Sequence, residues 1–470
     1  MDIKKTKVFG YQVHEDRFFL IFALCFGIIL VFLTPPFQVP DEPAHFLRAY
    51  QVSDINFMPA VENNSLGGYV PLSTYQLMAE YNGLNNINKR VSRELINAAR
   101  CISLNPEVRN FGFFPNTSLY SPVPYLPQAV GINIGKVFNA PPLFLFYLGR
   151  LLNLFAWILL MFHAIRIIPM GKWLFVVLAL LPMNMQLAAS LNADAMTIGL
   201  TFVFIAMVVR LIVDDKTAIN IKTLTILAIL AVLIALSKSV YIFPVLLIFL
   251  IPIKKYDGIK KYLLANGIIA ALAFGAALAG VMVVNHLIGQ IQPIEHFYGT
   301  DPITPKINPG MQMEFIFSDI PGFVMMVIRS FQDKIYMVSY SFIGILGWMC
   351  VVLPTWYYLS AIAFIIFITL TSFNQEYNFS LFMRFVFLTL FVAILGVFSF
   401  TMYCSWTEPG AAMIDNLQGR YFLPAAPLAL LAFANTGIRI SEKIKFTLVL
   451  LFFILSLLIT VKALLFHYYI

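Results

Sequence analysis

The sequence predicts an all-α polytopic membrane protein, which crosses the bilayer with about 11 transmembrane helices. Of its 470 residues, 60% are hydrophobic and only 11% are charged, whereas a soluble domain is about a quarter charged. Apolar runs of about 20 residues, the length that crosses the hydrocarbon core as a helix, recur along nearly the whole chain. These runs lack the alternation of apolar and polar residues that barrel strands show. Helices are therefore the structures in which these runs satisfy their backbone hydrogen bonds in lipid.

We expect a single transmembrane domain over residues 1–470, in which each apolar run forms one span. The expected spans are 18–36, 143–168, 172–190, 194–213, 221–237, 240–253, 262–286, 354–373, 382–403, 421–438 and 445–465. The formal net charge of +8 is spread over short loops between these runs. This distribution indicates contacts to the lipid bilayer, the expected partner, and argues against nucleic acid.

The basic residues also predict the orientation of the spans. Lys4, Lys5 and Arg17, among others, precede the first span, and further Lys and Arg residues gather in alternate short loops. Because such residues favour the cytoplasmic side, we expect a cytoplasmic N-terminus. The two long loops, residues 37–142 and 287–353, then face the extracytoplasmic side.

The first long loop is expected to carry amphipathic helices beside the membrane. Apolar residues recur at helical spacing in 44–52 and 91–102, and a further helix is expected over 125–138, after a proline-rich stretch. The cytoplasmic loops are only about 4 to 12 residues long, whereas a nucleotide-binding domain needs about 100 residues. An enzyme with this topology would act on substrates that are lipid-borne or already exported.

The first candidate site directly follows the first span. A helix is expected to start near Asp41, because Asp is a good N-cap and Pro43 fits the first turn. Asp41, His45 and Arg48 then lie at i, i+4 and i+7 on one face, where a carboxylate could act as general base beside an anion site. The alternative is structural: Asp41 caps the helix, Glu42 favours its dipole and Arg48 contacts headgroups.

Further candidates lie at the ends of later spans. Lys238, followed by Tyr241, is expected on the outer side, where it would hold a lipid phosphate or else snorkel along lipid. Asp194 would contact a sugar hydroxyl, with capping of the next helix as the alternative reading. Arg150 lies about two turns inside a span, where arginine usually faces the bundle or a wet cavity.

The last candidate precedes the span at 421–438. Arg420 would grip a phosphate with its planar guanidinium, Gly419 would permit a close backbone approach, and Gln418 would help to bind substrate. The alternative is an interfacial anchor formed by Arg420 and its neighbour Tyr421. The histidines show no metal-ligand spacing, so we expect no metal and no other cofactor.

Several stretches resemble the bacterial membrane family called domain of unknown function 2142. The resemblance is collinear over about residues 35–430, and its longest motif is PPFQVPDEPAHFLRAYQ at 35–51. The shorter motifs are YSPVPYLPQAVG at 120–131, LGRLLNL at 148–154, LLPMNMQLAASLNADAMTI at 180–198, LSKSVY at 236–241, FIGILGW at 342–348 and QGRYFLP at 418–424.

That family is similar to the C-type glycosyltransferases, multi-span enzymes that use polyprenyl-phosphate sugars. The resemblance implies a location in the bacterial plasma membrane. It also implies that Asp41 or Glu42, just after the first span, is a catalytic base or orients the acceptor. We therefore expect transfer of a sugar from polyprenyl phosphate to a cell-envelope glycan or lipid-linked acceptor, with Lys238, Arg420 and Arg150 beside the leaving phosphate.

Three other readings remain open at the level of sequence. A polysaccharide polymerase or ligase would use the same donor but depend more on arginines. A transporter or flippase of lipid-linked glycans would show inverted repeats and broken helices near the midplane, and no clear repeat is present. A scaffold protein without catalysis would tolerate loss of the carboxylates at 41 and 42.

Overall fold

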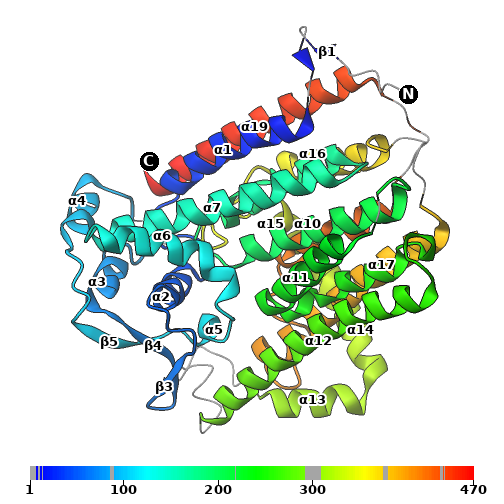
Figure 1. Ribbon diagram of the computed structural model, residues 1–470. Helices are drawn as coiled ribbons and strands as arrows, with labels where there is room; N and C mark the ends of the chain where they lie inside the picture. The colour runs from blue at the N-terminus through cyan, green and yellow to red at the C-terminus, as the bar shows by residue number, and fades with distance from the viewer. Residues whose placement is uncertain are drawn as a thin grey trace.

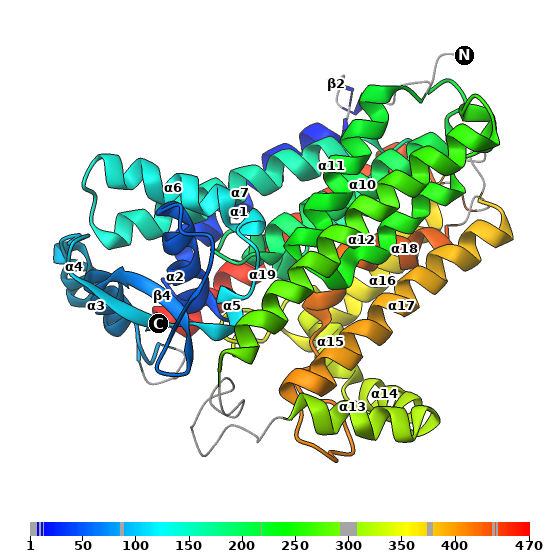
Figure 2. The ribbon, with the colours of Figure 1, turned by 60° about the horizontal axis from the view of Figure 1, so that its bottom comes forward.

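The computed structural model describes residues 7–8, 11–12, 14–84, 89–217, 219–291, 308–373, 379–434, 438 and 440–470. Its helices form an elongated bundle, and residues of the first long loop form a separate group of helices and strands at one end of it (Figure 1; Figure 2). A two-stranded hairpin, β1 (Lys7–Val8) and β2 (Tyr11–Gln12), precedes the first helix.

Six helices among the described residues are long and apolar enough to cross a membrane, which makes the chain a multi-pass membrane protein. They are α1 (Glu15–Leu33), α7 (Pro142–Ile167), α10 (Asp194–Val213), α12 (Ile259–Gly289), α17 (Leu381–Trp406) and α19 (Glu442–Tyr468). The pair α13 (Pro309–Ser318) and α14 (Ile320–Asp333), bent by 109°, makes a seventh if it is one broken span.

The expected count of eleven spans is not supported. Five expected spans coincide with helices that are shorter or broken: α8 (Lys172–Ala179) with α9 (Pro182–Ala188), α11 (Ile221–Ser237), η2 (Ser239–Leu250), α16 (Thr355–Thr371), and η5 (Gly419–Ala425) with α18 (Ala426–Ala432). The α-helices α11 and α16 have 17 residues each and are about 26 Å long at ~1.5 Å per residue, and the 3-10 helix η2 has 12 residues and is about 24 Å long at ~2.0 Å per residue. Both lengths are less than the ~30 Å hydrocarbon core. Pro182, Pro244 and Pro424 lie within or beside the breaks, where proline removes a backbone donor.

The first long loop contains helices and a small sheet. Its helices are α2 (Glu42–Ser53), α3 (Leu72–Glu80), α4 (Arg93–Cys101), α5 (Pro115–Ser118), η1 (Val123–Tyr125) and α6 (Leu126–Val137). Thus α2, α4 and α6 confirm the three helices expected from the sequence. The antiparallel sheet β3 (Ala60–Glu62), β4 (Ser65–Pro71) and β5 (Arg109–Phe113) was not predicted. Its short strands meet at Gly67, where an added Cβ would lie 1.6 Å from the Gly112 carbonyl oxygen.

One face of α2 packs against residues 116–125, as the spacing of Asp41, His45 and Arg48 predicts. The His45 Nδ1 lies 2.8 Å from the Tyr125 hydroxyl, and Arg48 Nη2 donates to the Tyr120 carbonyl over 2.8 Å. Arg48 also donates to the Gln51 side chain and to the Phe57 carbonyl. These bonds hold α2 in a fixed position beside the ends of the spans.

A buried ion pair joins the start of α2 to the second long span. Glu42 and Arg150 are both fully buried, and their side chains meet through two bonds, Nε to Oε1 at 2.8 Å and Nη2 to Oε2 at 2.6 Å. Arg150 also donates to three carbonyl groups where α1 ends, those of Val31, Thr34 and Pro35. This arginine therefore binds the orphan carbonyls that a helix leaves at its C-terminus.

The spans α1 and α19 lie side by side and reach the first long loop at the same end (Figure 1). The Tyr469 hydroxyl donates to the Leu33 carbonyl over 3.0 Å, and the Val91 amide donates to the Tyr468 carbonyl over 2.8 Å. We call the membrane side that carries residues 37–142 the loop side.

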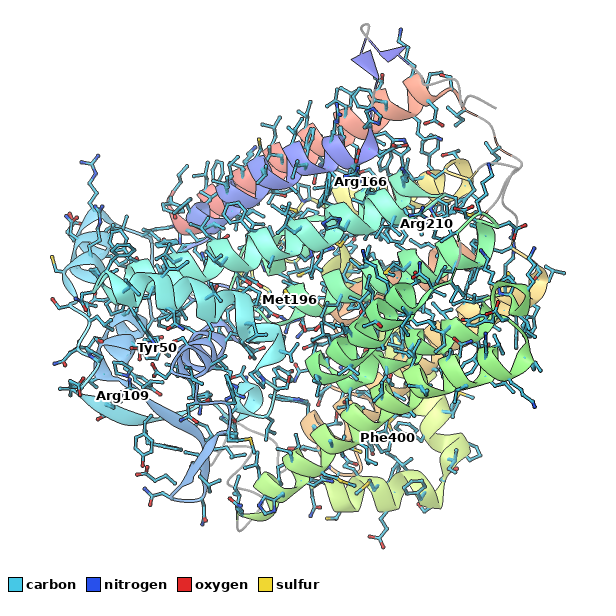
Figure 3. The ribbon with its side chains drawn as sticks, in the orientation of Figure 1. Tyr50, Arg109, Arg166, Met196, Arg210 and Phe400 are labelled. Atoms are coloured by element: carbon cyan, nitrogen blue, oxygen red, sulfur yellow. The ribbon has the colours of Figure 1, made fainter. Side chains whose placement is uncertain are left out.

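Arg166 and Arg210 lie near the ends of α7 and α10 that point away from the loop side (Figure 3). This separation agrees with the expected topology, while the orientation in the cell stays a prediction. Lys4 and Lys5 of the orientation signal and residues 292–307 of the second expected loop lie outside the described residues.

Removing one member of the buried pair should destabilise the fold strongly. Glu42→Gln or Arg150→Met is expected to lower the free energy of unfolding by about 3–5 kcal/mol, because each leaves the other charge buried and unpaired. Denaturant titration of the purified protein in detergent micelles measures this loss.

Arg210→Met is the matched control, because Arg210 is half exposed and lies 3.8 Å from Asp214 in a surface pair. Its loss should cost less than about 1 kcal/mol. A double variant, Glu42→Gln with Arg150→Met, should cost less than the sum of the single changes. Equal costs for Arg150→Met and Arg210→Met would contradict the central role of the pair.

Candidate functional site

Four charged side chains from separate parts of the sequence meet at the loop side of the bundle. Arg420 Nη2 lies 3.6 Å from Asp41 Oδ2, and Lys238 Nζ lies 3.0 Å from Asp194 Oδ1. Both pairs lie close enough to His45 for all four charges to act on its titration. The chain thus brings together Asp41, Asp194, Lys238 and Arg420, which we call the charged cluster.

Asp41 is the accessible carboxylate of the cluster. The helix start near Asp41 is confirmed, but its side chain makes no capping bond, and its backbone is left-handed with φ of 62°. The carboxylate instead faces outward, with the Asn116 amide at 3.3 Å and 40% of its side chain exposed. This freedom from capping leaves Asp41 available as a proton acceptor.

Arg420 is buried beside Asp41 and is only partly paired. Gly419 makes this position possible, because an added Cβ there would lie 1.9 Å from the Val338 carbonyl oxygen. Arg420 is 4% exposed and donates through Nη2 to the Tyr421 hydroxyl over 3.1 Å. Within the described residues, its Nε and Nη1 have no hydrogen-bond partner although both are buried.

Lys238 and Asp194 form a second, nearly buried pair within the cluster. Three tyrosine rings surround the ammonium group, with centroids at 5.7, 6.0 and 5.2 Å from Nζ for Tyr120, Tyr241 and Tyr421. The snorkelling reading of Lys238 is therefore wrong. The capping alternative, which covers Asn192 or Asp194, fits Asn192, because its side chain accepts from the Asp194 amide at the start of α10 over 2.8 Å.

His45 lies behind Asp41 and is buried. Burial is the largest cause that lowers the pKa of His45, to about 4, while the nearby Asp41 and Asp194 carboxylates oppose it. The imidazole is therefore neutral near pH 7, and its Nδ1 is hydrogen-bonded to the Tyr125 hydroxyl over 2.8 Å. Its contacts give it a positioning role between α2 and η1.

Three expected site residues have other roles in the structure. Glu42 is fully buried, accepts bonds from Arg150 at both carboxylate oxygens, and accepts a further bond at Oε1 from the Leu191 amide. Its contacts give it a structural role, whereas Asp41 is 40% exposed. Arg150 uses its donors on that pair and on the end of α1, so the contacts of the described chain give it a structural role. Arg48 is 1% exposed and donates to the carbonyls of Phe57 and Tyr120, which also gives it a structural role. The expected roles of both residues beside a substrate stay predictions.

The remaining expected residues flank the cluster. The Tyr241 hydroxyl donates to the Tyr421 carbonyl over 2.6 Å, which ties η2 to η5. Gln418 has a buried Oε1 that is unpaired within the described chain. The sequence did not single out Asn116 or Tyr120, and it gave Tyr421 only as part of an interfacial anchor. The 21 tyrosines and 45 phenylalanines of the chain obscure a local aromatic signal.

The cluster combines a half-exposed carboxylate with buried cations in an aromatic wall. Such a set can accept a proton and stabilise an anion at adjacent points. Within the described residues, no three His, Cys, Asp or Glu side chains form a group suited to a metal ion.

The low pKa of His45 predicts a loss of stability in acid. The unfolded chain binds a proton below about pH 6.5, whereas the folded chain binds it only below about pH 4, so stability falls between these values as pH falls. The loss is expected to reach about 3 kcal/mol. Melting temperatures recorded from pH 7 to 4 should fall less for His45→Gln than for the wild type. His163→Gln, outside the cluster, is the control, and an equal fall in all three proteins would contradict the assignment.

Comparison with known proteins places most of the chain in one family. Residues 24–429 match the family model described as "Predicted membrane protein (DUF2142)", which confirms the family resemblance seen over residues 35–430. No curated protein and no solved structure matches the chain. These comparisons do not show the similarity to C-type glycosyltransferases. Because the match covers more than half of the 470 residues, the chain belongs to the DUF2142 family of predicted membrane proteins.

Proposed function

We propose that this protein is a membrane glycosyltransferase that moves a sugar from a polyprenyl-phosphate donor to a cell-envelope glycan or lipid-linked acceptor on the extracytoplasmic side. The observation that carries the proposal is the pairing of Asp41, half exposed, with Arg420, whose buried Nε and Nη1 lack a partner in the described chain. A base beside an unfilled anion site is the minimum that this transfer needs.

The proposed reaction exchanges one bond at the anomeric carbon. Asp41 accepts the proton of the acceptor hydroxyl, while the oxygen of that hydroxyl forms a bond to the anomeric carbon. The bond between the carbon and the donor phosphate oxygen breaks, and its electron pair leaves with the lipid phosphate. Arg420 stabilises the charge that develops on this phosphate, because cations in a site of low dielectric act strongly on a charged leaving group.

The unpaired donors of Arg420 favour the binding of an anion at this site. Leaving a buried donor unsatisfied costs about 1–3 kcal/mol, and more for a charged group. A phosphate oxygen would relieve that cost and form short, charge-assisted hydrogen bonds. Asp194 lies 3.0 Å from Lys238 and largely neutralises its charge. Lys238 therefore contributes to the electrostatic potential of the site, while Arg420 contacts the phosphate directly.

Transport of lipid-linked glycans is the second candidate. The helices α8 and α9, as well as η5 and α18, are broken near the site, and broken helices are common at transporter sites. Transport of a glycan without a reaction needs no proton acceptor. The activity of Asp41 variants therefore distinguishes transport from sugar transfer.

Asp41→Asn should abolish sugar transfer while leaving the fold intact. Asn tolerates the left-handed backbone of residue 41 and keeps the volume of Asp, but it cannot accept the proton. Loss of a general base costs about 10²–10⁴-fold in rate. A deletion strain carrying each variant is examined by the mass of its purified envelope glycan.

In that experiment the deletion should lack one sugar, and wild type should restore it. Glu94→Gln is the matched control, since Glu94 is an exposed carboxylate of the same loop, and it should restore the sugar as well. Full restoration by Asp41→Asn would favour transport, and a deletion without any mass difference would favour a scaffold.

Arg420→Lys should weaken binding of the lipid phosphate by about tenfold or more, because lysine keeps the charge but loses donors in a fixed plane. Titration of the purified protein with polyprenyl phosphate in detergent measures the affinity. Arg329→Lys, on the exposed face of α14, is the control and should bind as wild type does. Equal affinities for both variants would remove Arg420 from the proposal.

A further inference from the structure

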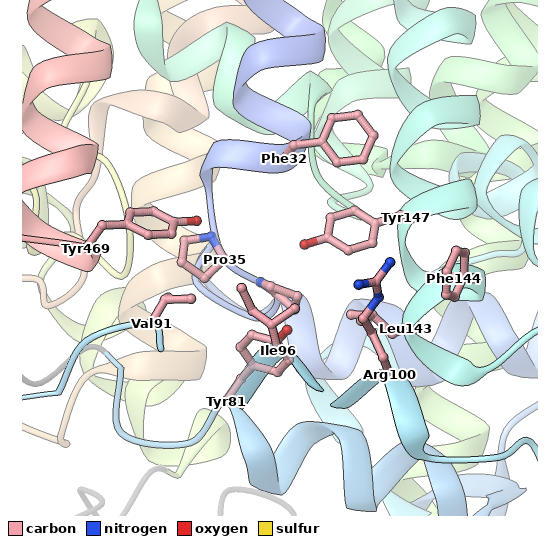
Figure 4. A pocket seen from close by; sticks show the side chains of 11 residues that line it. Phe32, Pro35, Tyr81, Val91, Ile96, Arg100, Leu143, Phe144, Tyr147 and Tyr469 are labelled. Atoms are coloured by element: carbon pink, nitrogen blue, oxygen red, sulfur yellow. The ribbon is translucent and has the colours of Figure 1, made fainter. Parts of the chain in front are cut away.

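A pocket separate from the charged cluster lies where three spans end on the loop side. It has a volume of about 250 Å³. Its walls come from the last turn of α1, the first turns of α7, the residue after α19, the residue after α3, and the loop helix α4 (Figure 4). Most of the lining is apolar or aromatic, including Phe32, Leu143, Phe144 and Ile96. The pocket therefore lies at the level where acyl chains give way to headgroups.

The pocket opens toward lipid. Phe32 is 52% exposed and Phe144 is 45% exposed, and both belong to membrane-spanning helices. Exposed apolar side chains on a span face hydrocarbon in the bilayer, so a lipid chain reaches the pocket without crossing water.

The polar groups of the pocket gather at one side of this apolar surface. Arg100 lines it from α4, and the hydroxyl groups of Tyr147 and Tyr469 face each other across it (Figure 4). Within the described residues, the Arg100 guanidinium and the Tyr147 hydroxyl have no hydrogen-bond partner. Among the described residues that line the pocket none is acidic, so the charge of this lining is positive and complements an anion.

We propose that this pocket binds an anionic phospholipid, with an acyl chain against Phe32, Phe144 and Ile96 and the headgroup phosphate on Arg100. Arginine suits this contact because its planar donors match phosphate geometry. The site is independent of the proposed transfer reaction, since none of its lining residues belongs to the charged cluster.

Lipid binding here also bears on the segment that leads to the cluster. Pro35 lines the pocket and gives its carbonyl to Arg150 over 3.2 Å. Tyr81 lines it too, and its carbonyl accepts a bond from the Gln38 amide over 3.3 Å. A bound lipid would therefore contact Pro35 and Pro36 at the start of this segment.

The test uses the delipidated full-length protein in detergent, titrated with phosphatidylglycerol or phosphatidylcholine of identical acyl chains and read by native mass spectrometry. The wild type should bind phosphatidylglycerol about fivefold more tightly, the effect of one arginine on one anionic headgroup. Arg100→Gln should lose this preference but still bind both lipids. Arg93→Gln, exposed on the same helix, should keep it.

Ile96→Trp should weaken the binding of both lipids, because the larger side chain fills the pocket. The melting temperature of this variant without lipid reports whether it folds. Equal binding of the two lipids by wild type, or an unchanged preference in Arg100→Gln, would overturn the proposal. Displacement of the lipid by soluble glycerol phosphate at equal concentration would also overturn it, because the acyl chain would then contribute nothing. None of these outcomes depends on whether the protein transfers a sugar.

Discussion

The ion pair of Glu42 and Arg150 is the constraint on which the position of the site depends. A guanidinium carries five N–H donors, and all of them are used here, on Glu42 and on three carbonyls at the end of α1. This fixes the path of the chain from the first span into α2. With Glu42 turned inward, the left-handed backbone of Asp41 directs the adjacent carboxylate outward. Two neighbouring acidic residues thereby acquire different environments and different roles.

The segments that carry the family resemblance form one connected network around this point. The Trp348 indole donates to the Phe37 carbonyl over 2.7 Å, and the Gly347 amide donates to the Gln186 side chain over 2.9 Å. Asn153 donates to the Ser190 carbonyl, and Ser121 donates to the Leu236 carbonyl. Most of these bonds connect loops that flank spans, where backbone groups lack helical partners and side chains must satisfy them. The motifs therefore serve first to hold the ends of broken helices together.

Local sequence patterns predicted part of this arrangement. Turn chemistry located the start of α2, and helical spacing placed Asp41, His45 and Arg48 on one face. Hydropathy predicted membrane helices but not their breaks, because Pro182 and Pro244 lie inside runs that remain apolar throughout. The pairing of Arg150 with Glu42, and of Lys238 with Asp194, depends on tertiary packing across 108 and 44 residues. A sequence pattern with a period of a few residues contains no information about such partners.

Two of the buried arginines, Arg150 and Arg420, differ in how many of their donors have a partner within the described chain. Arg150 is fully buried and every donor has an acceptor, so its interactions stabilise the fold. Arg420 is almost equally buried, at 4% exposure, yet Nε and Nη1 lack partners in the described chain. Burying a charged donor without a partner costs stability, and within the described chain Arg420 leaves two donors without one, whereas Arg48 leaves only its Nε. A bound group that accepts hydrogen bonds from Nε and Nη1 of Arg420 would remove this cost. A phosphate beside the half-exposed Asp41 would be such a group. The same criterion gives Glu42 a structural role, because it is fully buried and both of its carboxylate oxygens accept bonds from Arg150.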